Sequence, residues 1–202
     1  MKKELFPPHK DISTILDIKG FNKAFDSCWN KLECSFFKFE RLQFYDEPEE
    51  PSYMAYKHKD FVKADQLLEE RISRQKPFYD VLARKNISFI RVRAVEFPLS
   101  DYLLNYELKA YRISARYGEK ILIADIMDSK LSELYNSMDF TLFDSKAVIV
   151  QNYNKHGFFI GGWLIEDPKY VERYKEIANK FIASAIPLDS FEKEIYGNHQ
   201  LV

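Results

Sequence analysis

Glycine is scarce in this chain, with only 6 among 202 residues. That scarcity argues against internal repeats, flexible linkers and loops that cradle a phosphate group. The sequence also lacks a phosphate-binding loop, a glycine-rich dinucleotide fingerprint and a nucleophile elbow of the G-x-S-x-G kind. The common cofactor signatures are therefore missing, and we predict a chain with no bound cofactor.

Cysteine and histidine are equally sparse. Cys28 and Cys34 are too few for a disulfide framework, and no further cysteine or closely spaced histidine completes a zinc pattern, so we predict two buried free thiols and no metal. All four histidines fall in predicted tails, loops or a hairpin turn: His9, His58, His156 and His199. A histidine base held on a rigid element is not expected.

Neither sign of charge dominates, because the formal net charge is −1. A chain without a positive field lacks the usual driving force for nonspecific binding to nucleic acid, so nucleic acid is not an expected partner. No apolar run approaches the length that spans a bilayer, and the first residues, MKKELFPPHKD, carry no apolar stretch after the lysines. The sequence predicts a cytoplasmic protein without a membrane partner.

What the chain does have is enough apolar residues, 46%, to bury one substantial core. We predict an N-terminal arm over residues 1–16, a single globular α/β domain over residues 17–188, and a C-terminal tail over residues 189–202. The domain is expected to hold a mixed sheet with a β-α-β unit, a C-terminal β-hairpin and flanking helices.

The β-α-β unit is the most clearly patterned part of the sequence. Residues 87–95 alternate in a β-branched, apolar run and predict a strand buried on at least one side. Pro98 ends this run, and Ser100 is placed to cap a helix whose predicted inner face carries Leu104, Leu108, Tyr111 and Ala115. Gly118 suits the end of that helix, and a second buried strand follows in EKILIADI, which predicts a parallel crossover.

Periodicity predicts the remaining elements. Helices are expected at residues 17–32 and 60–74, from Pro77 onward, and from Asp167 onward. In the second helix, Glu69, Glu70, Arg71 and Arg74 are expected to face water. Strands are expected at residues 35–45 and 140–143, and in a hairpin formed by AVIVQNY and GFFIGGWLI; the segment DEPEEP, residues 46–51, predicts a solvated loop.

A few polar side chains lie on the predicted strands and strand ends. They are Glu40, Arg91, Arg93, Tyr102, Glu107 and Asp144. One interpretation is structural: Arg91 or Arg93 bridges to Glu40 or Glu107, because an unpaired buried charge is costly. A second places these residues around a pocket at the carboxyl ends of the strands, with the arginines receiving an anion. A third makes a catalytic carboxylate pair of Glu40 with Glu107 or Asp144.

Several strings in the sequence resemble, in the same order, a bacterial family described as domain of unknown function 6879. They are FKFERLQFYDEPEE, RVRAVEFPLSDYLLNYEL, GEKILIAD, DFTLFDSKAVIVQNYNKHGFFIGGWLIEDPKYVERY and ASAIPL, and they cover roughly residues 21–188. The family's R-V-R, P-L-T/S-D-Y and F-E places are occupied here by Arg91, Arg93, Asp101, Tyr102 and Glu107. The family's R-L-E falls on residues 38–40, where lysine replaces the arginine.

This resemblance implies a regulatory or accessory role, because members are often encoded beside helix-turn-helix regulators. The last third also looks like phospholipase D-like domains, whose histidine, lysine and aspartate spacing is not kept in HKDFVKAD at His58. Our leading hypothesis is a non-catalytic domain that binds a partner protein, such as a transcriptional regulator, or a small anionic ligand. The alternatives are a phosphodiester or nucleotide hydrolase that uses carboxylates and arginine, and an accessory protein that contacts nucleic acid through Lys57, Lys59, Lys63, Arg84 and Lys85.

Overall fold

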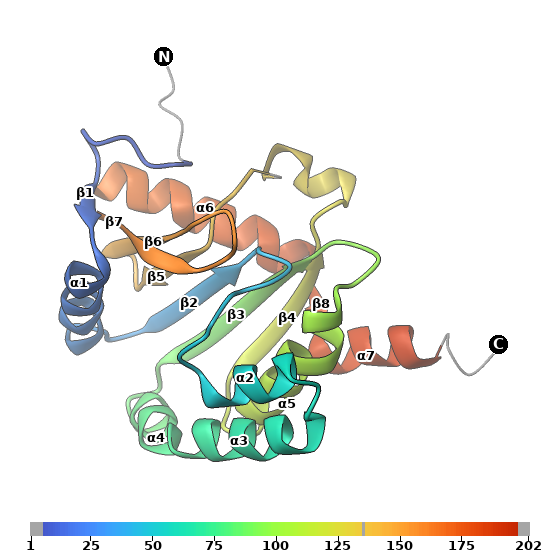
Figure 1. Cartoon of the computed structure of the whole chain (residues 1–202). Helices are drawn as coiled ribbons and strands as arrows, with labels where there is room; N and C mark the ends of the chain where they lie inside the picture. Colours follow the sequence, from blue (N-terminus) through green and yellow to red (C-terminus); the bar gives the residue numbers. More distant parts are fainter. Residues whose placement is uncertain (1–5, 135, 198–202) are drawn as a thin grey trace.

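An eight-stranded mixed sheet runs through the middle of the protein (Figure 1). The structure is a computed structural model, and it describes residues 6–134 and 136–197. The strand order is β1 (Thr14–Leu16), β7 (Phe159–Ile165), β6 (Ala147–Tyr153), β5 (Phe140–Phe143), β2 (Ser35–Glu40), β3 (Ser88–Val95), β4 (Lys120–Asp125) and β8 (Ile186–Pro187). Strands β2, β3 and β4 are parallel, while the other pairs are antiparallel. The predicted fold class, a single α/β domain around a mixed sheet, is confirmed.

Helices cover both faces of this sheet. One face carries α6 (Pro168–Ser184) together with the 3-10 helix η2 (Ser129–Leu134). The other carries α1 (Ile18–Asn30), α2 (Pro51–Lys57), α3 (Phe61–Ser73), α4 (Lys76–Arg84), the π-helix η1 (Leu103–Glu107), α5 (Leu108–Arg116) and α7 (Leu188–Gly197). Figure 1 shows α6 crossing one side of the strands, with α2 to α5 gathered on the opposite side. None of these described helices has the length and apolar character to cross a membrane.

Side-chain alternation assigns the residues of β2 and β3 to the two faces. Phe37 and Phe39 enter the core beneath α6, whereas Phe36, Lys38 and Glu40 point toward α1 to α5. In β3, Phe89, Arg91, Arg93 and Val95 point the same way as Glu40. Because successive residues of a strand alternate between faces, all the strand charges of β2 and β3 fall on one face. Glu40 therefore lies on the face of β2 opposite Phe37 and Phe39.

The β-α-β unit is confirmed, with β3 and β4 parallel and η1 and α5 between them. Ser100 caps this helix, because its Oγ accepts a hydrogen bond from the amide of Leu103 at 3.2 Å. The predicted inner face is wrong at both ends, since Leu104 is only half-buried and Ala115 is exposed. The π-helical turn η1 inserts an extra residue, which rotates the apolar stripe away from regular α-helical spacing.

Four boundaries differ from the sequence predictions. The predicted strand at residues 35–45 ends at Glu40, and the predicted loop at residues 46–51 gives way to α2 at Pro51. The predicted N-terminal arm contains β1, which pairs with β7, and the predicted C-terminal tail contains most of α7, whose Phe191 is buried. Residues 1–5 and 198–202, including His199, lie outside the described residues. That residues 17–188 form the domain by themselves stays a prediction.

The hairpin of β6 and β7 is confirmed, and its glycines let backbones approach each other closely. Gly157 in the turn has a φ of +79°, which suits glycine. Gly161 has a φ of +125°, and a Cβ placed there would lie 2.2 Å from the carbonyl oxygen of Leu16. Glycine at this position therefore allows β1 to pair with β7.

We expect Gly161→Ala to destabilise the protein more than Gly118→Ala. Both glycines have a positive φ, so each alanine costs about 1–3 kcal/mol of backbone strain. Only Gly161 faces a backbone atom within 4 Å, and the displacement of β1 adds about 1–3 kcal/mol. Urea unfolding of the two variants measures the difference. Equal losses in the two variants would show that the β1 contact contributes nothing.

Candidate functional site

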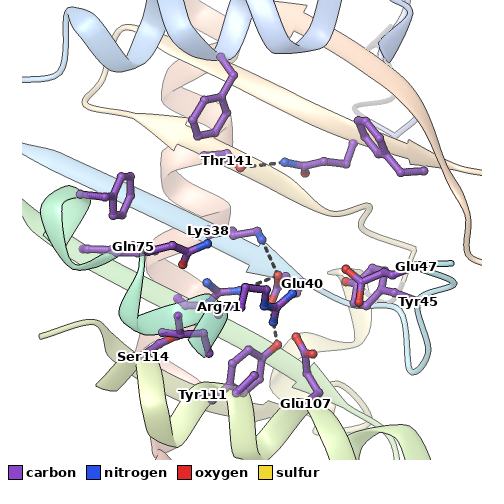
Figure 2. Close-up of a pocket in the computed structure, with 18 of the residues that line it drawn as sticks. Lys38, Glu40, Tyr45, Glu47, Arg71, Gln75, Glu107, Tyr111, Ser114 and Thr141 are labelled. Atoms are coloured by element: carbon purple, nitrogen blue, oxygen red, sulfur yellow. Dashed lines mark hydrogen bonds and ion pairs between the residues drawn. The ribbon is translucent and has the colours of Figure 1, made fainter. Parts of the chain in front are cut away.

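A pocket of about 610 Å³ lies on the face of the sheet that α1 to α5 cover. Its base comes from β2, β3, β5 and β6, and its walls come from α1 on one side and α3, α4 and α5 on the other. Figure 2 shows Arg71 and Gln75 on one side, Tyr111 and Glu107 below, and Glu47 at the far end, all around Glu40. The predicted residues Glu40, Arg91, Tyr102 and Glu107 all line this pocket.

A buried ion network forms the floor of the pocket. Arg91 donates from one guanidinium nitrogen to Glu40 at 2.8 Å, and from its Nε to Glu119 at 2.5 Å. Lys38 lies 2.7 Å from the same Glu40 oxygen, and the hydroxyl of Tyr111 donates to the other oxygen at 2.5 Å. Both oxygens of Glu40 are therefore occupied, as the structural interpretation of the sequence predicted for Arg91.

These contacts keep the network ionised. Burial by itself raises the pKa of Glu40, but the positive charges of Arg91 and Lys38 outweigh burial and hold that pKa well below its usual range. Burial likewise lowers the pKa of Arg91, and the carboxylates of Glu119 and Glu40 raise it well above its usual range. A carboxylate that stays charged and fully bonded has no capacity for general acid or base catalysis near neutral pH.

Arg93, the other predicted anion receptor, is 0% exposed. Its guanidinium lies over the ring of Tyr45, donates to the Tyr45 hydroxyl at 3.1 Å and donates to the carbonyl oxygen of Leu42. The Tyr45 hydroxyl in turn donates to Asp139. Arg93 thus ties the loop after β2 to the sheet, and neither of the predicted arginines presents an open guanidinium to the pocket.

Two further carboxylates meet at one end of the pocket. The hydroxyl of Tyr102 lies 2.9 Å from Glu107 and 3.4 Å from Glu47. Burial, and then the negative charge of Glu107, raises the pKa of Glu47 to about 7. Sequence reasoning missed Glu47, because its segment, DEPEEP, was predicted to be solvated. The charge pattern contained no sign that this loop would fold over the strand ends.

Arg71 is the second functional residue that the sequence prediction misplaced. It was expected to face water, but it lines the pocket beside Ile72. It forms an ion pair with Glu50 at 3.3 Å, and its buried Nε has no hydrogen-bond partner within the described part of the chain. A signal was present in the spacing: Arg71 follows Leu68 by three residues, which places it at the edge of the buried stripe.

Asp144 does not belong to this site. It lies beyond the opposite end of β2, has a φ of +53°, and accepts hydrogen bonds from the amides of Glu33, Cys34 and Ser35. Its role is to anchor the start of β2. The prediction that Asp144 joins Glu40 is therefore wrong, and so is the prediction of two buried thiols, because Cys34 is exposed and Cys28 is half-buried.

Metal binding has no obvious location here. Across residues 6–134 and 136–197, no three His, Cys, Asp or Glu side chains are arranged to hold an ion. The pocket contains free hydrogen-bonding capacity instead, in the Nε of Arg71 and in the buried Oε1 of Gln151.

The fold and the pocket define a single-domain α/β protein with an open mixed sheet. The pocket on one face of this sheet is lined by polar and aromatic side chains. A family model matches residues 23–193, and the chain belongs to that family, which is described as a domain of unknown function (DUF6879). This match confirms the family predicted from the sequence strings. No curated protein sequence matches the chain significantly.

Three solved structures are similar to the chain over most of its length. Nuc, a phospholipase D family member from Salmonella typhimurium, is 9% identical with a TM-score of 0.47, covering 82% of this chain and 89% of Nuc. NucT from Helicobacter pylori is 12% identical with a TM-score of 0.47, and the match covers 87% of this chain and 98% of NucT. The archaeal chromatin protein TrmBL2, which binds DNA, is 12% identical with a TM-score of 0.48, covering 93% of this chain and 57% of TrmBL2. These similarities assign no activity to this chain.

We expect Glu40→Gln to lower the free energy of unfolding by about 3–5 kcal/mol, because it leaves the buried Arg91 without one of its two charge partners. Lys38→Met is the matched control. The Lys38 side chain is a third exposed, so its removal should cost less than about 1 kcal/mol. Urea unfolding measures both variants. A Glu40→Gln protein as stable as the control would show that the network contributes little.

Stability should also fall as the pH rises through neutrality. The pKa of Glu47 is raised from its ordinary value of 4.5 to about 7, so the folded state holds a proton that the unfolded state has lost. This contribution is fully present below pH 4.5 and disappears as the pH passes 7. Urea unfolding at pH 5, 6, 7 and 8 should show a decline that Glu47→Gln removes and that Glu49→Gln, in the same loop, retains. An unchanged decline in Glu47→Gln would assign it to another group.

Proposed function

We propose that this chain is a non-catalytic ligand-binding domain with a regulatory or accessory role, and that a small molecule with an anionic group occupies the pocket. The observation that carries the proposal is the combination of a 610 Å³ pocket with a floor whose charges are already paired. Pockets of this size bind small molecules, and a rigid polar floor fixes the orientation of what enters. Chemistry at the floor has no support, because Glu40 and Arg91 are fully engaged.

The anionic group of the ligand is best received by Arg71 and Lys38. Arg71 offers a buried Nε that bonds to nothing, and Lys38 has a partly exposed ammonium beside Glu40. A guanidinium with a free edge binds carboxylate or phosphate oxygens with strong, charge-assisted hydrogen bonds. The anion site of the sequence prediction is thereby moved from Arg91 and Arg93 to Arg71.

Other lining residues narrow the class of ligand. Glu47 and Glu107 add negative charge at one end of the pocket, which favours a ligand that also carries N–H or ammonium donors. The pocket is apolar near α1 and α4, where Phe25 and Phe78 of these helices and Phe89 of β3 line it. We therefore propose an amphoteric molecule with a ring or other apolar part.

The regulatory part of the proposal rests on the family resemblance. That resemblance implies that members are often encoded beside helix-turn-helix regulators, and on this ground we propose a cytoplasmic protein whose protein partner is a transcriptional regulator. Ligand binding in the pocket would then be the signal that the partner responds to.

Hydrolysis of a phosphodiester or nucleotide is the second candidate function. One observation favours it: Glu47 has a pKa of about 7 and lies in a pocket beside Glu107, which suits a general acid or base. Turnover of model diesters or nucleotides that Glu47→Gln abolishes would support this candidate over binding alone. The third sequence hypothesis has less support, because Lys57, Lys59 and Lys63 lie around the start of α3, whereas Arg84 and Lys85 lie at the far end of α4.

Binding in the pocket should change the fluorescence of Trp29. The Trp29 ring stacks on Phe78 with 4.3 Å between centroids, and Phe78 lines the pocket. Trp163, the other tryptophan, packs on the opposite face, so Trp163→Phe makes Trp29 the sole reporter. We expect a saturable change with amphoteric ligands, such as aromatic amino acids and their acylated or amidated forms. Arg71→Met should weaken binding about tenfold, the loss of one charge-assisted hydrogen bond.

Arg74→Met is the matched control for Arg71→Met, because Arg74 lies at the end of the same helix, α3, and does not line the pocket. This variant should leave the titration unchanged. The absence of any saturable response to amphoteric, anionic or cationic compounds at millimolar concentration would contradict the proposal. Equal weakening in both variants would place the ligand elsewhere.

A further inference from the structure

A second cleft, of about 920 Å³, lies beyond the carboxyl end of β2. Its walls are the loop after β2, residues 41–46, the segment before β5, residues 136–139, and the β6–β7 turn, residues 154–157. Lys57, at the end of α2, closes one side. The cleft shares Asp46, Gln151, Tyr153 and Gly157 with the pocket described above, but its cationic residues are different.

The charges of this cleft are mainly positive. Arg41, Lys57 and Lys155 line it, and so does His156. Neither Lys57 nor Lys155 has an ion-pair partner among residues 6–134 and 136–197; Lys57 lies 5.5 Å from the centre of the Phe44 ring instead. On a chain with a net charge of −1, Lys57 and Lys155, from separate segments, make a local attraction for an anion, whereas Arg41 forms an ion pair with Glu96 at 3.5 Å.

The two acids of the cleft are already engaged. Asp139 accepts from the Tyr45 hydroxyl and, at 2.8 Å, from the amide of Arg41. Asp46 accepts from the hydroxyl of Tyr53 at 3.0 Å. These hydrogen bonds reduce the electrostatic repulsion between the two carboxylates and an incoming anion.

Two buried polar atoms in the cleft have nothing to bond to. Ser137 is 4% exposed and Gln151 is 6% exposed, and neither the Oγ of Ser137 nor the Oε1 of Gln151 has a hydrogen-bond partner in the described part of the chain. Buried polar atoms in folded proteins are nearly always paired, so an unpaired one calls for an explanation. A hydroxyl donor and an amide acceptor at the same cleft fit a ligand that carries both an oxyanion and an N–H group.

We propose that this cleft binds a phosphorylated molecule with a planar, N–H-bearing ring, of which a nucleoside monophosphate is the simplest example. Lys57 and Lys155 receive the phosphate oxygens, and the hydroxyl of Ser137 donates to one of them. Phe44, 37% exposed, offers a face on which the ring stacks, and the Oε1 of Gln151 accepts a hydrogen bond from the ring N–H. The cations that receive the phosphate are not those of the first pocket, although the Oε1 of Gln151 lines both.

Calorimetric titration of the full chain with AMP, GMP, CMP and UMP tests the proposal. We expect at least one of them to bind. Ribose 5-phosphate should bind more weakly because it lacks the ring, and the free nucleoside should bind more weakly because it lacks the phosphate. Lys57→Gln combined with Lys155→Gln should weaken binding at least tenfold, the loss of about one charge-assisted hydrogen bond. The control, Lys19→Gln combined with Lys85→Gln, removes the same charge from outside the cleft and should bind as the unmodified chain does.

Ser137→Ala provides a sharper variant. Because the Oγ of Ser137 bonds to nothing in the unliganded protein, the alanine should leave the melting temperature unchanged while lowering nucleotide affinity about tenfold. Failure of all four nucleotides to bind at millimolar concentration would overturn the proposal. So would equal weakening in the two lysine pairs, or binding of a short oligonucleotide alone, since that would indicate a nucleic-acid surface.

Discussion

The buried ion network of Glu40, Arg91 and Glu119 is the constraint on which this structure depends. Strand alternation places Glu40 and Arg91 on one face of a sheet that is otherwise packed with rings, and neither charge is stable there alone. The network is satisfied only when β2 and β3 are in parallel register and α5 brings Tyr111 onto Glu40. The charges therefore specify one arrangement of strands and helix, where apolar residues would tolerate several.

The pocket lies directly above this network. Its walls are α1 on one side and the group of α3, α4 and α5 on the other. The helices bring their own polar groups, Arg71, Glu107 and Tyr111, to the edge of that opening. A floor that is rigid and already neutralised suits recognition of a ligand more than reaction with it.

Much of the fold was readable from local pattern. The alternation of β2 and β3, the cap at Ser100 and the hairpin of β6 and β7 follow from spacing and turn residues, which act over a few positions. The pairing of Arg91 with Glu40 was also within reach, because buried charges require partners. The π-helical turn η1 was not, since it depends on packing against α2 and α3, and it moved Leu104 and Ala115 out of the core. Asp144 was misassigned because chain order does not show which end of a strand a neighbouring loop contacts.

The sequence by itself determined which residues carry charge on the central strands and which charges of one strand share a face, because a strand alternates with a period of two whatever surrounds it. The pairing of β2 with β3 then brought the charges of both strands to the same face. Only the tertiary structure decided which of those charges have ion-pair and hydrogen-bond partners, and which polar groups from distant segments keep free hydrogen-bonding capacity. Glu47 has its pKa near 7 and Arg71 its free Nε because a loop and a helix converge on the strand ends. Burial and proximity arise from packing between segments far apart in the chain, and no local pattern encodes them.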